Sequence, residues 1–224
     1  MRKSNTLVKI SICLLVIVIS INPTISNLEG KEVKYITTKS RLGARFENSY
    51  VMYSEVTIGK QIWMASNLNT AKFRNGDSIP EVKTIYDFQK ADAKKEPAFC
   101  KINSESFAYN WYAINDPRGL APKGWHIPND NEWTQLTDNL GGLNIAGKKM
   151  KSMSDWKSHP RTFGTNDSGF SAIPDKGGYT GLFWSSTENS INDAWARKLT
   201  FDYDYVYRVS IKKQSGCYVR CVKD

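Results

Sequence analysis

Thiols and imidazoles are the side chains of this 224-residue sequence best suited to metal or covalent chemistry. Beyond the first 26 residues there are three cysteines, Cys100, Cys217 and Cys221, and two histidines, His126 and His159. No Cys-x-x-Cys spacing accompanies them, although a structural zinc site needs four convergent ligands. No Gly-x-Ser-x-Gly sequence supplies a serine nucleophile. The sequence therefore indicates no metal site, no cofactor and no catalytic residue of these classes.

Alternating aromatic and acidic residues near the C-terminus, FDYDYVY at 201–207, indicate binding instead. A continuous strand would present the rings on one side, to stack on a sugar face or a peptide, and carboxylates on the other, to accept from hydroxyl groups. The alternative is a hairpin turn over residues 202–205 with half-buried tyrosines. A second polar pair follows WSST at 184–187 and either faces a ligand or caps a strand. The candidate ligand-binding residues are Tyr203, Tyr205, Asp202, Asp204, Glu188 and Asn189.

The N-terminus predicts export. Three cations in residues 1–9 precede a 12-residue apolar stretch, ISICLLVIVISI at 10–21, which is too short to span a bilayer. Asn22-Pro23 and small residues follow, so we expect a signal peptide over residues 1–26, cut near Ser26, with an uncleaved anchor as the alternative. The mature chain is then secreted or held in the cell envelope (periplasm or outer surface), without a membrane span.

Composition argues against a disordered chain and against a nucleic-acid-binding protein. With 40% hydrophobic and 24% charged residues, the chain should fold around a core. The formal charge is +9, but the cations occur in short pairs separated by acids and aromatics, so no stripe for nucleic acid is evident. The heavy aromatic load includes Trp63, Trp125, Trp133 and Trp184, which we expect in the core, with one or two lining a groove as the alternative.

Local patterns predict an α+β domain over residues 55–224, after an N-terminal tail or arm at 27–54. Gly59-Lys60 fits a hairpin turn between residues 56–58 and 61–64. We expect helices at 104–114, at 130–140, where Asn129 and Glu132 form a capping box, and a short turn at 146–150. Residues 152–181 should be irregular. Antiparallel strands at 195–201, 206–211 and 218–222 should close the domain.

Export also changes how the cysteines are interpreted. Cys217 and Cys221 are four apart in a strand-like segment, so a bond between them would need a sharp bend. Cys100 is therefore the expected partner of one of them, and the third thiol is free. The residues alone leave open which of the two pairs with Cys100.

Several segments resemble the Fibrobacter succinogenes major paralogous domain, a module of secreted bacterial proteins. The matching pieces are GKQIWMASNL (59–68), YNWYA (109–113), DPRGLAPKGWHIPNDNEW (116–133), GFSA (169–172), WSSTE (184–188) and VRCVKD (219–224). The resemblance implies a C-type-lectin-like fold with antiparallel strands, two main helices and long irregular loops. It also implies a Cys100 to Cys221 disulfide, leaving Cys217, where the family usually carries an aromatic, as a free thiol.

The same resemblance frames the functional hypotheses. Calcium-lectin sites in the wider fold use Glu-Pro-Asn or Gln-Pro-Asp with Trp-Asn-Asp, and none of these occurs here. We therefore expect a non-catalytic module that binds an extracellular glycan or protein. The alternative is an enzyme similar to the formylglycine-generating sulfatase-modifying enzymes, using a thiol and copper. A carboxylate pair for glycoside hydrolysis stays open, because the separation of the two groups is spatial.

Overall fold

The computed structural model describes residues 53–89, 94–160 and 162–224. The predicted signal peptide and residues 27–52 of the predicted arm lie outside the described residues. Helices and antiparallel sheets are both present, so the α+β prediction is confirmed. The elements are β1 (Glu55–Ile58), β2 (Gln61–Met64), η1 (Ile85–Asp87), β3 (Phe99–Lys101), β4 (Phe107–Tyr109), α2 (Trp111–Ile114), β5 (Trp125–His126), α3 (Asp130–Asn139), α4 (Leu143–Met150), β6 (Thr180–Glu188), β7 (Asp193–Thr200), β8 (Tyr207–Lys212) and β9 (Val222–Lys223).

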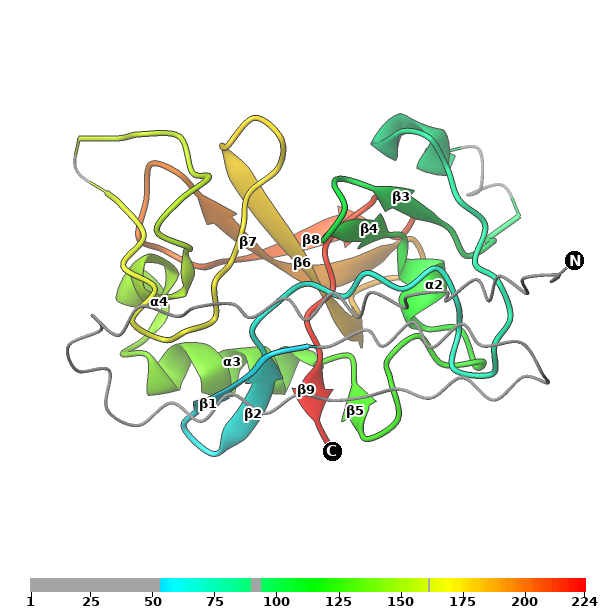
Figure 1. Cartoon of the computed structure of the whole chain (residues 1–224), viewed down its shortest axis with the longest axis horizontal. Coiled ribbons are helices and arrows are strands. Elements are labelled where there is room, and N and C mark those ends of the chain that lie inside the picture. The colour runs from blue at the N-terminus through cyan, green and yellow to red at the C-terminus, as the bar shows by residue number, and fades with distance from the viewer. Residues whose placement is uncertain (1–52, 90–93, 161) are drawn as a thin grey trace, which may run out of the picture. The chain divides into compact units, whose positions relative to one another are not determined.

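Three antiparallel sheets organise the described chain. β6, β7 and β8 form a three-stranded sheet in sequence order, and β3 and β4 form a two-stranded ladder. The four-stranded sheet has the order β1-β2-β9-β5, so the last strand lies between the first hairpin and β5 (Figure 1). The C-terminal segment is therefore built into the middle of a sheet whose other strands lie between residues 55 and 126.

The first hairpin forms as predicted. β1 and β2 pair with Ile58 opposite Gln61, and Gly59 has a φ of +62°. A side chain at Gly59 would be strained in this conformation, and its Cβ would lie 2.3 Å from the side chain of Asn139. Glycine is therefore needed at the turn both for its φ and for the close approach of the end of α3.

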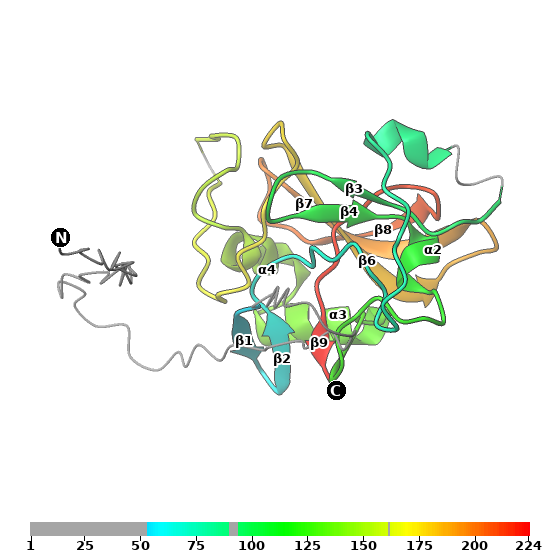
Figure 2. The ribbon, with the colours of Figure 1, turned by 45° about the vertical axis from the view of Figure 1, so that its right-hand side comes forward.

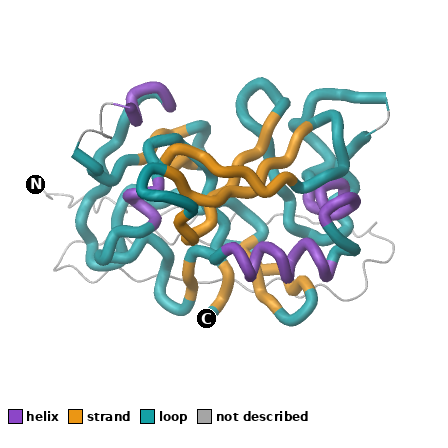
Figure 3. Tube along the Cα trace, turned by 180° about the vertical axis from the view of Figure 1, so that it is seen from behind, coloured by secondary structure: helices purple, strands orange, loops and turns teal. Residues whose placement is uncertain are grey.

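The helix predicted at 130–140 is confirmed as α3. The Asn129 side chain accepts from the Glu132 amide at 3.0 Å, and the Glu132 carboxylate accepts from the Asn129 amide at 2.8 Å. The buried Trp133 and Leu136 lie on the face of α3 that packs on β6 and β7 (Figure 3). α4 extends the predicted turn at 146–150 toward the N-terminus. No helix among the described residues has the length and apolar character needed to cross a membrane.

The helix predicted at 104–114 is wrong over its first half. Residues 107–109 form β4, which pairs with β3 and places Tyr109 opposite Phe99. Asn110 then caps α2, since its side-chain oxygen accepts from the amides of Ala113 at 3.1 Å and Ala98 at 3.0 Å. The four-residue spacing of aromatics that suggested a helix instead spans a strand, a cap and one helical turn.

The strand predicted at 218–222 is also corrected. Only Val222 and Lys223 form a strand, β9, and Val222 lies opposite both Trp63 and His126 in the four-stranded sheet. β9 does not join the three-stranded sheet expected at the end of the chain. The third strand of that sheet is β6, which precedes β7 in sequence. The described residues between 152 and 179 carry no helix or named strand, as predicted, whereas residues 180 and 181 of the expected irregular stretch belong to β6.

The four tryptophans predicted to be in the core are all buried. Trp63 and Trp133 pack with ring centroids 4.9 Å apart. The indole nitrogens of Trp133 and Trp184 donate to the carbonyls of Trp184 and Tyr109 at 3.2 and 2.7 Å. Each ring thus buries a large apolar area without leaving its N–H unsatisfied.

A buried guanidinium, that of Arg220, joins distant parts of the domain. Its N–H groups donate to the Asn67 side-chain oxygen and to the carbonyls of Met64, Phe170 and Ser171. Its plane lies over the Phe170 ring, 4.4 Å from the centroid. No carboxylate of the described residues pairs with it, so burial lowers the pKa of Arg220. The charge is stabilised by neutral oxygens and by an aromatic ring.

Replacing Arg220 should destabilise the fold strongly. We expect Arg220→Met to lower the free energy of unfolding by about 3–5 kcal/mol, because several buried oxygens lose their donors. Arg220→Lys should recover part of the loss, since an ammonium has fewer donors and no planar face. Urea unfolding measures both, and Arg118→Met, at a more exposed position, is the control that should cost much less. An unfolding free energy unchanged by Arg220→Met contradicts this account.

Candidate functional site

The residues between β7 and β8, which carry the predicted tyrosines and aspartates, form a turn. The chain is not extended over residues 201–206, so the alternative of a hairpin turn is confirmed over that of a continuous strand. Tyr203 is 57% exposed, whereas Asp202, Asp204 and Tyr205 are half-buried. The rings of Tyr205 and Tyr207 pack together at 4.7 Å. Of the rings of Phe201, Tyr203, Tyr205 and Tyr207, that of Tyr203 is therefore the most exposed.

A buried lysine positions this turn. The Lys151 ammonium donates to the carbonyls of Thr200 and Tyr203 at 3.2 and 2.9 Å and lies 3.9 Å from the Asp204 carboxylate. Burial lowers the pKa of Lys151, and the charges of Asp204 and Asp202 oppose that effect. Asp204 is turned inward, since its Oδ1 is buried. One of its two carboxylate oxygens therefore faces the interior of the turn, toward Lys151.

The turn also presses against α4. The Val206 amide donates to the Leu143 carbonyl at 2.9 Å. A Cβ added at Gly147 would lie 2.5 Å from the Asp204 carbonyl oxygen, so the helix backbone itself touches the turn. Figures 1 and 2 both show the β7–β8 connection, in orange, beside α4. The solvent-facing ring of Tyr203 is thus carried on a braced segment.

Aromatic side chains from two other loops gather at this end of the three-stranded sheet. The Phe201 ring meets the Tyr179 ring edge-on at 5.3 Å, and Thr162 Oγ1 donates to the Phe201 carbonyl at 2.7 Å. Phe163 follows Thr162 and is 65% exposed, and Tyr179 is 47% exposed. We call Phe163, Tyr179, Phe201 and Tyr203 the aromatic end.

Sequence reasoning missed Tyr179 and Phe163 as members of this group. Both lie in the irregular stretch before β6, where no periodicity indicates which way a side chain points. The place of Tyr179 follows from the backbone bond between the Phe201 amide and the Tyr179 carbonyl, at 3.0 Å, and that of Phe163 from the neighbouring Thr162, which donates to the Phe201 carbonyl. Only the pairing of β6 with β7, which places Thr180 opposite Thr200, could have indicated that Tyr179 lies next to Phe201.

Glu188 and Asn189 do not join the aromatic end. They lie where β6 ends, while residues 201–205 follow the far end of β7, so the length of β7, about 24 Å, separates the two groups. Glu188 accepts from the buried Lys213 ammonium at 2.8 Å, and the Asn189 side chain donates to Ser210 Oγ at 2.8 Å. Both side chains are engaged in holding the β6–β7 hairpin against β8.

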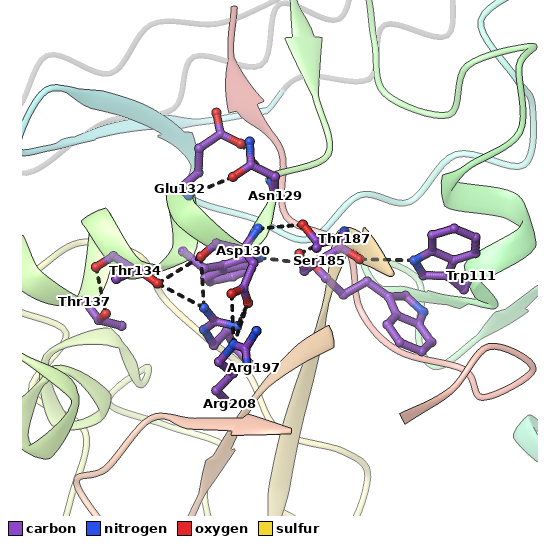
Figure 4. A network of polar contacts seen from close by, with 12 residues as sticks. Trp111, Asn129, Asp130, Glu132, Thr134, Thr137, Ser185, Thr187, Arg197 and Arg208 are labelled. Carbon is purple, nitrogen blue, oxygen red and sulfur yellow. Dashed lines mark hydrogen bonds and ion pairs between the residues drawn. The ribbon is translucent and has the colours of Figure 1, made fainter. Parts of the chain in front are cut away.

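A carboxylate at the start of α3 is occupied by two arginines. Arg197 Nη1 donates to Asp130 Oδ1 at 2.6 Å, and Arg208 Nε donates to Asp130 Oδ2 at 2.9 Å (Figure 4). The Asp130 amide donates to Thr187 Oγ1 at 3.0 Å, and the Arg208 guanidinium stacks over the Trp195 ring at 3.3 Å. This network joins α3 to β6, β7 and β8. It serves packing, and both oxygens of the Asp130 carboxylate are held by guanidinium groups.

His126 lies between two carboxylates. Its Nε2 is 2.7 Å from Glu132 Oε1, and its Nδ1 is 2.8 Å from Asp224 Oδ1. Partial burial opposes the charged ring, but the hydrogen bonds to Glu132 and Asp224 together raise the pKa of His126. The carboxylates lie at opposite edges of the ring and cannot converge on one ion. Across the described ranges, no three His, Cys, Asp or Glu side chains are arranged to hold a metal.

The predicted disulfide is not formed among the described residues, where Cys100, Cys217 and Cys221 are all buried free thiols. The strand register gives the reason. Cys100 lies opposite Ala108, whereas Cys217 lies opposite Tyr109. Because successive residues of a strand point to opposite faces, Cys100 and Cys217 lie on different faces of the ladder. Cys221 belongs to the same buried cluster as Cys217, so Cys100 is separated from both.

Comparison with known proteins finds one family. The family model of the Fibrobacter succinogenes major domain matches residues 56–223, which confirms the family expected from the sequence. No curated protein and no solved structure matches the chain.

Stability should depend on pH through His126. Its pKa is raised in the fold above the ordinary 6.5, so its contribution is present below that value and is lost as pH rises through the folded pKa. We expect the stability difference between wild type and His126→Gln to be largest near pH 5 and to shrink by about pH 8. Solvent screening limits it to about 1 kcal/mol.

Thermal unfolding at several pH values measures this difference. Asp224→Asn, which removes one partner of the ring, should show a weaker pH dependence than wild type. The interpretation fails if wild type and His126→Gln follow parallel curves.

Proposed function

We propose that this chain, which belongs to the Fibrobacter succinogenes major domain family, is a non-catalytic binding module for an extracellular glycan or protein. The observation that carries the proposal is the aromatic end. Phe163, Tyr179 and Tyr203 expose large rings from three separate segments at one end of the β6–β8 sheet. Scattered apolar residues are normal on a surface, but a cluster of rings on a braced support is typical of a binding site.

A glycan fits this surface better than a flat protein partner. Aromatic rings stack on the C–H faces of sugars, and the phenol hydroxyls of Tyr179 and Tyr203 can hydrogen-bond to ring hydroxyls. Lys157 lies 5.7 Å from the Tyr179 ring centroid and Lys148 lies 4.8 Å from that of Phe163. These ammonium groups add donors at the edges of the rings.

The support beneath the rings favours recognition of a ligand with little rearrangement. Lys151 and Gly147 hold the β7–β8 turn from below, so Tyr203 loses little freedom when a ligand binds. Preorganisation of this kind reduces the entropy cost of association. Of the residues expected from the sequence, Tyr203 is therefore the main contact, and Asp202 is a neighbour that can accept from a ligand hydroxyl.

The alternative, an enzyme similar to the sulfatase-modifying enzymes with a thiol and copper, has less support. Such chemistry needs an accessible thiolate. Cys217 and Cys221 are buried in the core, and burial raises the pKa of both thiols, that of Cys221 to about 12. These thiols behave as small apolar side chains that fill the core.

The location and finer architecture belong to the same proposal. The predicted signal peptide supports export to the cell envelope or medium, where glycans are accessible ligands. Antiparallel strands, two main helices and the long irregular stretch before β6 support a C-type-lectin-like arrangement. On this proposal the scaffold is shared with the sulfatase-modifying enzymes, while the chemistry is not.

A glycan array with matched variants tests the proposal. We expect Tyr203→Ala and Tyr179→Ala each to weaken binding roughly 3- to 10-fold, because each removes a stacking ring. Tyr86→Ala is the control, since Tyr86 is 77% exposed but lies outside the aromatic end.

Binding that all three variants retain equally contradicts the site. Binding to no glycan contradicts the glycan ligand. The protein ligand is then tested by a pull-down with the same three variants.

A further inference from the structure

We propose that a cavity next to the aromatic end, with which it shares Tyr179, binds a small amphipathic carboxylate, with an apolar body inside and the anionic group at two lysines. The cavity has a volume of about 480 Å³. It lies between the β3–β4 ladder, the start of β6 and residues 216–218, next to the 175–180 loop. A volume of this size is typical of small-molecule sites and is too small for a folded partner.

The inner wall is apolar. It includes Ala108 of β4, Leu182 of β6 and Cys100 of β3, whose side chain lies on the same face of the ladder as Ala108. Burial raises the pKa of the Cys100 thiol, so it is neutral and acts as apolar wall. An unpaired charge would be poorly solvated here, and an alkyl or aryl body would be well accommodated.

The exposed lining residues carry an excess of positive charge. Lys83 and Lys176 are exposed, and neither makes an ion pair with a described carboxylate. Lys101 also lines the cavity, but its ammonium donates to Glu81 at 2.9 Å. The lining acid, Asp175, accepts through Oδ1 from two backbone amides of its own turn. Two cations beside the apolar interior are thus without an ion-pair partner among the described residues.

The position of Lys176 links this charge to the cavity. Its charge acts on the Cys100 thiol, lowering the pKa that burial has raised. The ammonium therefore lies within electrostatic reach of the cavity wall. A carboxylate held by Lys176 and Lys83 would stay at the solvent-exposed side, where its hydration is only partly lost, while its apolar body fills the interior.

Calorimetry with decanoate, an alkyl carboxylate, tests the proposal directly. We expect decanoate to bind below its micelle concentration and 1-decanol, which lacks the charge, to bind more weakly. The double variant Lys83→Gln/Lys176→Gln should weaken decanoate binding by at least about fivefold and leave decanol unchanged. Added salt should weaken decanoate binding to wild type. Lys60→Gln, an exposed lysine in the β1–β2 turn, is the matched control.

Thiol protection supplies a second readout at the wall itself. Saturating decanoate should slow the reaction of Cys100 with a small methanethiosulfonate reagent, because the alkyl chain covers its sulfur, and should leave Cys217, on the other face of the ladder, unaffected. The proposal is overturned if decanoate gives neither binding heat nor protection. It is also overturned if the lysine variants bind decanoate as wild type does, since the lysines then have no part in recognition.

Discussion

The buried guanidinium of Arg220 is the interaction on which the rest of the structure depends. A cation without a carboxylate partner is tolerated inside a protein only when other groups satisfy all its donors. Here the acceptors come from the end of β2, from Asn67 and from the loop at Phe170. Fixing those three segments around Arg220 also fixes β9 between β2 and β5, and with it the frame that carries both proposed sites.

A buried cation that donates to backbone carbonyls is also found beneath the aromatic end. Lys151 is buried and donates to the carbonyls of Thr200 and Tyr203, with the Asp204 carboxylate 3.9 Å away, so a second buried cation shapes an irregular segment. Irregular backbone has few partners of its own, and a side chain with several donors supplies them. In this domain, long loops are therefore ordered by buried cations, and the rings that they carry are presented to solvent in fixed positions.

Local rules were enough to predict the elements whose determinants are close in sequence. The capping box of Asn129 and Glu132 and the glycine of the first hairpin each act within a few residues. The strand at 107–109 could not be predicted this way, because it exists through pairing with β3. The Cys100 bond inferred from family resemblance differs from the structure because register decides which face a thiol occupies. The position of Tyr179 in the aromatic end is likewise determined by the pairing of β6 with β7.

Native-state hydrogen exchange tests the central claim most directly. The amides of Met64 and Leu68 donate to the carbonyls of Cys221 and Val219, on either side of Arg220, at 3.0 and 2.9 Å. If the buried guanidinium fixes this segment, both amides exchange only through global unfolding, with the free energy that denaturant unfolding gives. Exchange of these two amides at a markedly lower free energy, with the rest of β2 still protected, would show that the C-terminal segment opens by itself and would contradict the account.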